Sequence, residues 1–163
     1  MRYGPKDSDV FVYTYKEGLL SAVAHDLELR VTDYWIDWDS TSGRIEAEFD
    51  AGSIRVVRTM SGTVSEGDKE KIEKNIVSDV LRTKKFPRIR CVAVKAKEPA
   101  FGCELTLCGT TRSIAVQMRA ARSGWEAESL LHQPDFGIKP FTAMLGAIKI
   151  KPDVRVLVRV PAG

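Results

Sequence analysis

Two histidines and three cysteines are the residues of this 163-residue sequence that could most readily act as bases, nucleophiles or metal ligands. His25 lies within an alternating apolar segment, and His132 ends another. Protein metal sites usually need three or four converging ligands, and the sequence has neither CxxC nor HxxxH spacing. The CxxxxC spacing of Cys103 and Cys108 is not a common zinc motif. We predict no metal ion, no cofactor and no catalytic residue.

The cysteines favour a structural role. Cys91 and Cys103 alternate with polar residues and share strand faces with aliphatic ones, which is typical of buried, inert thiols. A Cys103–Cys108 bridge is the alternative, but an odd number of cysteines fits a reducing compartment. The amino terminus lacks the apolar run of a secretory signal, so we expect a cytoplasmic protein.

No recognisable catalytic or phosphate-binding motif is present. The sequence contains no GxSxG elbow, no GxGxxG and no GxxxxGK[ST] loop. One catalytic hypothesis stays open, in which His25 and a nearby acid or thiol modify a lipid-like substrate.

The elements that must position these residues are predicted to be β-strands, because apolar and polar residues alternate along most of the chain. In residues 19–31, one face carries Val23, His25, Leu27, Leu29 and Val31. Phe49 lies on the apolar face of another such segment. The predicted strand segments are 9–15, 19–31, 44–54, 88–96, 101–109, 111–120, 124–131 and 153–160. Many short strands at regular spacing predict an all-β fold, a single antiparallel barrel of about eight strands.

Only one segment has helical periodicity. Ile72, Ile76 and Val80 fall on one helix face, and Ser65 and Asp68 have the spacing of a capping box. Pro87 prevents the helix from continuing. We therefore predict one amphipathic helix at about 66–83, inserted into a single domain that spans residues 1–163 and covering an open end or edge of the sheet.

The predicted barrel suggests a binding function. A barrel of about eight strands has an interior just wide enough for one small ligand, and the inward residues here are mainly aliphatic. Each buried methylene contributes about 0.8 kcal/mol before the costs of association, so a chain of about ten carbons or more would bind usefully. A fully filled core is the alternative, and alternation alone does not distinguish the two.

Charge is distributed unevenly along the sequence. Residues 1–80 have a net charge of −6 and residues 81–163 one of +9, and the run 82–97 contains seven basic residues and no acid. This run is either a solvated strand face with a helix end, or a patch that contacts anionic lipid headgroups or an acidic partner. The basic half lacks the interleaved aromatic residues of a nucleic-acid platform, so we expect no nucleic-acid partner.

Several motifs together resemble the YceI-like family of polyisoprenoid-binding, lipocalin-like proteins. The motifs are SAVAHDLELRVTDY at 21–34, SGTVSEGDKEKIEKNIVSDVLRTKKFPRIRC at 61–91, LTLCGTTRSIAV at 105–116 and DFGI at 135–138. The resemblance implies an extended eight-stranded lipocalin-like barrel with an elongated apolar cavity for polyisoprenoids or fatty-acid-like amphiphiles. It also implies a homodimer, and many relatives are exported.

The resemblance adds candidate binding residues to those of the strand pattern. His25 matches the family's histidine on an inward strand position, and Phe86, Phe136 and Ile138 match apolar family positions. The predicted ligand-binding residues are therefore His25, Val23, Leu27, Leu29, Phe49, Phe86, Phe136 and Ile138. The leading hypothesis is non-enzymatic binding, storage or transport of a long-chain hydrophobic ligand. The alternative is a filled barrel that docks an acidic partner through its basic half.

Overall fold

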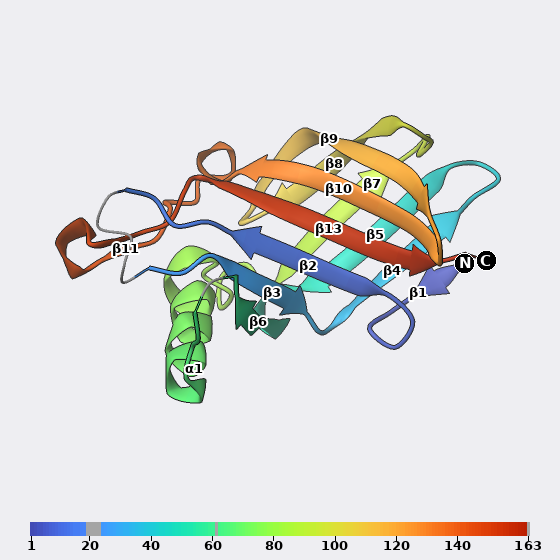
Figure 1. Ribbon diagram of the computed structural model, residues 1–163. Helices are drawn as coiled ribbons and strands as arrows, with labels where there is room; N and C mark the ends of the chain where they lie inside the picture. The colour runs from blue at the N-terminus through green and yellow to red at the C-terminus, as the bar shows by residue number, and fades with distance from the viewer. Residues whose placement is uncertain (19–23, 61, 163) are drawn as a thin grey trace.

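The computed structural model describes residues 1–18, 24–60 and 62–162. Its main element is one antiparallel sheet of eleven strands that curls into an incomplete barrel (Figure 1). The strands of this sheet are β1 (Arg2–Tyr3), β2 (Asp9–Thr14), β3 (Leu27–Val31), β4 (Tyr34–Asp39), β5 (Arg44–Asp50), β6 (Ile54–Thr59), β7 (Arg88–Ala93), β8 (Ala100–Leu107), β9 (Thr110–Ala121), β10 (Gly124–His132) and β13 (Asp153–Pro161). The spatial order is β1-β4-β5-β7-β8-β9-β10-β13-β2-β3-β6, so β1 and β6 form its two edges.

The predicted all-β class and antiparallel lipocalin-like architecture are confirmed, but the strand number is not. Eight predicted segments each contain a strand of the sheet, and β1, β4 and β6 are additional. β4 shows the same alternation as the others, since Tyr34, Ile36 and Trp38 are buried. β1 is only two residues long, which is too short to give a periodic signal.

The strand predicted over residues 19–31 starts later than predicted. β3 begins at Leu27, so His25 precedes the strand instead of lying inside it. Asp26 ends the preceding loop, where its Oδ1 accepts a hydrogen bond of 2.8 Å from the backbone N–H of Lys16. The backbone carbonyl of Asp26 still accepts from the N–H of Met60 at 2.8 Å, so this segment stays beside the end of β6.

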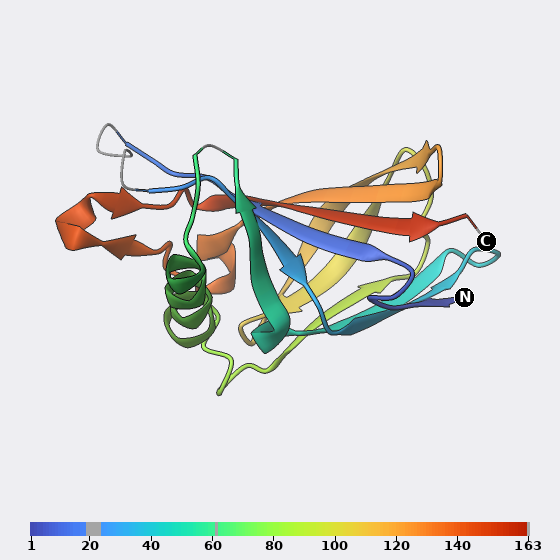
Figure 2. The same ribbon diagram turned by 60° about the horizontal axis from the view of Figure 1, so that its bottom comes forward.

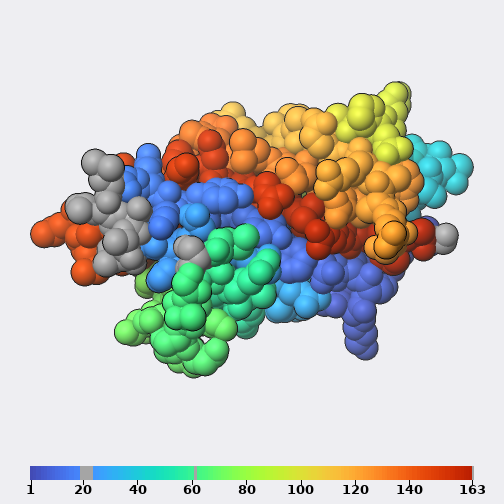
Figure 3. All heavy atoms as spheres, viewed as in Figure 1, coloured from blue at the N-terminus to red at the C-terminus, as the bar shows by residue number. Residues whose placement is uncertain are grey.

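The single predicted helix is present and is shorter than expected. Helix α1 spans Glu66–Asn75 and continues as a π-helical turn over Ile76–Val80. Ser65 caps it, because its Oγ accepts the backbone N–H of Asp68 at 3.1 Å. The helix lies across one end of the curled sheet, where Figures 2 and 3 show it beside β3 and β6.

Helix α1 also protects one edge of the sheet. The backbone N–H of Val56 in the edge strand β6 donates to Oε1 of Glu73 at 2.9 Å. An edge strand otherwise presents unpaired backbone donors, so this carboxylate stands in for a neighbouring strand.

A two-stranded hairpin extends the same end of the molecule. It consists of β11 (Thr142–Ala143) and β12 (Ile148–Lys149), and Figure 1 shows it projecting beyond the sheet. The backbone N–H of Glu17 donates to the carbonyl of Lys149 at 2.8 Å, which ties the hairpin to the chain after β2. Helix and hairpin therefore frame one end, and the two chain termini lie at the other.

The prediction that Cys91 and Cys103 are buried free thiols is wrong. Cys91 in β7 and Cys103 in β8 are joined by a disulfide, with their Cα atoms 6.4 Å apart, and Cys108 is the free cysteine. The strand register explains this pairing, because Cys91 lies opposite Leu105 and Cys103 is two residues away on the same face. Cys103 is therefore closer in space to Cys91 than to Cys108.

The thiol of Cys108 should react slowly. Burial raises its pKa above the ordinary value of 9.0, and the neighbouring Arg82 lowers it by a smaller amount. Because the thiolate is the nucleophile, alkylation of the folded protein by iodoacetamide at pH 8 should be slower than that of free cysteine and still rise above pH 9. Labelling under denaturing conditions should find one thiol without reductant and three with it. Three thiols without reductant would contradict the Cys91–Cys103 bond.

Candidate ligand-binding site

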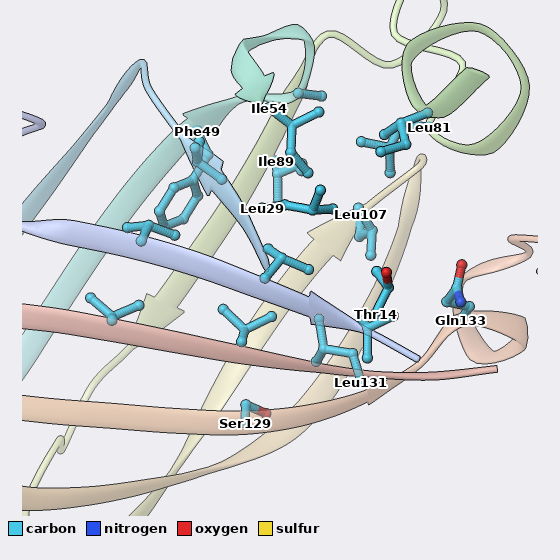
Figure 4. Close-up of a pocket in the computed structure, with 18 of the residues that line it drawn as sticks. Thr14, Leu29, Phe49, Ile54, Leu81, Ile89, Leu107, Ser129, Leu131 and Gln133 are labelled. Carbon is cyan, nitrogen blue, oxygen red and sulfur yellow. The ribbon is translucent and has the colours of Figure 1, made fainter. Parts of the chain in front are cut away.

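The inward faces of the curled sheet enclose a deep cavity of about 600 Å³. This volume lies within the range of small-molecule sites. The wall is almost entirely apolar, and Figure 4 shows aliphatic side chains from several strands pointing toward a common space. Alternating positions of the central strands supply much of it, including Val10, Val12, Leu105, Leu107, Val154, Val156 and Val158.

Helix α1 and the hairpin complete the wall at one end. Ile72 and Ile76 of the helical segment and Ile148 of the hairpin line the cavity. Polar side chains also gather there, namely His25, Asp68, Lys71, Asn75 and Gln133. Gln133 is held in place because its Nε2 donates to the carbonyl of Lys151 at 3.1 Å.

The opposite end of the cavity lies beside the chain termini and is aromatic. The amino group of Met1 donates to the carbonyl of Trp38 at 2.6 Å, and Trp125 pairs with Val160 near the carboxyl terminus (Figure 1). Trp38 and Trp125 both line the cavity and pack edge to face, with ring centroids 5.8 Å apart and an interplanar angle of 88°. The cavity therefore has a polar end at α1 and an apolar, aromatic end at the termini.

Two buried polar atoms on the cavity wall have no hydrogen-bond partner among residues 1–18, 24–60 and 62–162. They are Oγ1 of Thr14, near the α1 end, and Nε1 of Trp38, at the aromatic end. Thr14 is drawn in Figure 4 beside Leu131.

Five of the eight predicted binding residues line this cavity: His25, Leu27, Leu29, Phe49 and Ile138. His25 is half-buried among the polar groups of the α1 end. Val23 lies outside the described residues.

Phe86 and Phe136 do not line the cavity, so the geometry does not support their predicted role as binding residues. Phe136 is only 2% exposed and packs in a cluster with Leu107 and Leu131. Phe86 is half-buried against Gly109, where a Cβ would lie 2.6 Å from its ring. Gly109 also has φ of +74°, which suits glycine. Both aromatic residues pack beside the cavity and contribute to the fold there.

Sequence reasoning missed the aromatic end and the helix contribution. Trp38 could have been found from the alternation of Tyr34, Ile36 and Trp38 in residues 34–39. Ile72 and Ile76 were recognised as one helix face, but the sequence does not show what that face covers.

The titratable groups of the site form no metal centre in the described part of the chain. No group of three or more His, Cys, Asp or Glu residues is placed to hold a metal ion there. None of the described helices is long and apolar enough to cross a membrane.

The basic run at 82–97 is partly neutralised. Arg88 lies 3.3 Å from Asp50 and 3.8 Å from Glu48, and Arg90 lies 3.9 Å from Glu48. The guanidinium of Arg82 lies over the ring of Phe86, with Cζ 5.1 Å from the centroid. These contacts favour the interpretation of the run as a solvated strand face.

A curled antiparallel sheet around one deep apolar cavity, with a helix across its end, defines the lipocalin-like class of β-barrel. The chain belongs to the YceI-like family, whose domain model matches residues 6–162. No curated protein sequence matches it.

Solved structures of low sequence identity share this fold. A polyisoprenoid binding domain from Saccharophagus degradans, implicated in plant cell wall breakdown, is 12% identical with a TM-score of 0.58, and the match covers 98% of this chain and 97% of that chain. Burkholderia cenocepacia BcnA is 13% identical with a TM-score of 0.60, covering 94% and 96%. A Campylobacter jejuni YCEI protein is 15% identical with a TM-score of 0.57, covering 83% and 84%.

Proposed function

We propose that this protein binds a long-chain hydrophobic ligand of the isoprenoid or fatty-acid and fatty-amide type in its cavity, and stores or transports it without changing it chemically. The observation that carries this proposal is the cavity of about 600 Å³ with an apolar wall. Supporting it, a protein of the same fold is described as a polyisoprenoid binding domain.

The distribution of polarity fits an amphiphile. Each methylene of an apolar chain that is buried along the strands contributes about 0.8 kcal/mol of favourable transfer free energy. A polar head would lie near His25, Lys71 and Gln133 at the α1 end. Because association costs several kcal/mol, we expect useful affinity only for chains of about ten carbons or more.

Native and denaturing mass spectrometry of freshly purified protein tests this function. We expect a stoichiometric hydrophobic adduct that organic extraction releases. Its repeated absence, together with no thermal stabilisation by added isoprenoids or fatty amides, would refute the proposal. The cavity itself argues against the alternative of a fully filled barrel.

Three further expectations from the sequence remain proposals. A homodimer is tested by sedimentation, and contact of the basic run with anionic membranes by salt-dependent co-sedimentation with vesicles. The cytoplasmic location is tested by fractionation. A disulfide such as Cys91–Cys103 is more typical of oxidising compartments, so fractionation should be combined with thiol labelling in cells.

A further inference from the structure

The indole N–H of Trp38 is a buried hydrogen-bond donor without an acceptor. Trp38 is 8% exposed, lines the cavity, and its Nε1 has no partner in the described parts of the chain. Buried Trp N–H groups usually find a partner, and an orphaned buried donor is unfavourable. The backbone of Trp38 is satisfied, since its N–H donates to the carbonyl of Met1 at 2.8 Å and its carbonyl accepts from the Met1 amino group. Only the side chain is left unpaired.

The polar side chains of the surrounding core cluster are engaged elsewhere. The cluster contains Tyr3 and Tyr34 besides aliphatic residues. The hydroxyl of Tyr34 donates to the carbonyl of Ser8 at 2.8 Å, and that of Tyr3 lies 3.7 Å from Sδ of Met1. The ring of Trp125 packs edge to face with that of Trp38 and offers at most a weak N–H···π contact.

The position of this donor matters because the polar group of His25, Lys71 and Gln133 lies at the opposite end of the cavity. A ligand whose head is held near α1 would carry the far end of its chain toward Trp38 and Trp125. A purely hydrocarbon end would leave the indole N–H unpaired. An indole N–H only donates, so its complement is a hydrogen-bond acceptor. A ketone, ester or ether oxygen accepts without bringing a further donor into this apolar end.

We propose that the buried end of the ligand carries an acceptor oxygen of the carbonyl type, which takes the hydrogen bond of Trp38 Nε1. The inference rests on the proposed function and narrows its ligand class, from any long apolar chain to one with a polar group at each end. Trp38 is then a residue that determines ligand specificity.

Two probes of equal chain length test the proposal on the delipidated protein. Hexadecanoic acid has a hydrocarbon end, and 15-oxohexadecanoic acid has a ketone there. Titration calorimetry of the unmodified protein should show that the ketone probe binds at least as tightly, despite the cost of desolvating its carbonyl. Trp38→Phe keeps an aromatic ring and removes the N–H. In this variant the affinity for the ketone probe should fall by about tenfold, while the affinity for hexadecanoic acid should change little.

Trp125→Phe is the matched control. It changes the same aromatic end but leaves the Trp38 N–H in place. The ratio of the two affinities, which defines the preference for the ketone probe, should therefore stay as it is in the unmodified protein. Equal loss of the preference in both variants, or a preference unchanged by Trp38→Phe, would overturn the proposal.

A second readout does not depend on the variants folding well. The protein has three tryptophans and thus three indole N–H signals in an ¹H–¹⁵N spectrum. The Trp38 signal should move downfield with the ketone probe and not with hexadecanoic acid. If both probes bind and this signal responds alike to each, only the present inference fails. If neither probe nor an isoprenoid binds, the proposed function fails with it.

Discussion

Ala127→Trp is expected to abolish lipid capture while leaving the protein folded. Ala127 lies in the middle of β10, where it pairs with Met118 and Val158 and lines the cavity. A Trp side chain there would occupy space that the ligand chain needs. Excluding even two methylenes costs about 1.6 kcal/mol, which is more than tenfold in affinity. Because the new side chain fills an existing void, we expect little loss of stability.

Binding of a fluorescent fatty acid and the thermal midpoint, measured on the same sample, check this expectation. Ala120→Trp is the matched control, because Ala120 is exposed on the neighbouring strand β9 and does not line the cavity. It should bind as the unmodified protein does. Unchanged binding by Ala127→Trp would place the ligand outside the cavity and remove the basis of the proposed function.

Phe136→Ala is expected to be the most destabilising substitution considered, without a direct effect on the cavity wall. The ring is almost completely buried, in a cluster with Leu107, Leu131 and Ile138. Phe→Ala substitutions at such positions cost about 3–5 kcal/mol, which for a domain of this size lowers the melting temperature by roughly 6–20 °C.

Phe11→Ala is the matched control for this substitution. Phe11 is half-buried, and its alternation with the cavity residues Val10 and Val12 places it on the outer face, so the loss should be clearly smaller. Below its melting temperature, Phe136→Ala should retain ligand affinity within about twofold. Full stability with lost binding would instead restore Phe136 as a ligand contact, as the motif resemblance predicted.

Much of the fold could be predicted because burial of one strand face leaves a local signal. The apolar set Leu27, Leu29 and Val31 is readable from sequence, and so is Phe49 on the inward face of β5. The N-cap at Ser65 is equally local, since donor and acceptor are three residues apart. Features of this kind can be predicted from the sequence because they require no knowledge of distant contacts.

Features that depend on the pairing of distant segments could not be derived in the same way. Cys91 and Cys103 are twelve residues apart, and only the register of β7 against β8 shows that they meet. Phe86 and Phe136 are apolar and near the cavity, but neither property distinguishes a wall residue from a residue packed behind the wall. The opening of the lumen likewise depends on how far the sheet curls, which alternation does not report.

The contact between Glu73 and Val56 links the position of helix α1 to the protection of a strand edge. Helix α1 both lines the cavity and shields the edge of β6. An outward movement of the helix would withdraw the carboxylate from the Val56 N–H and leave a strand edge able to pair with another chain. A bound ligand that contacts Ile72 and Ile76 would hold the helix in place and so reduce aggregation. The ligand-free protein would then be the form that precipitates most readily.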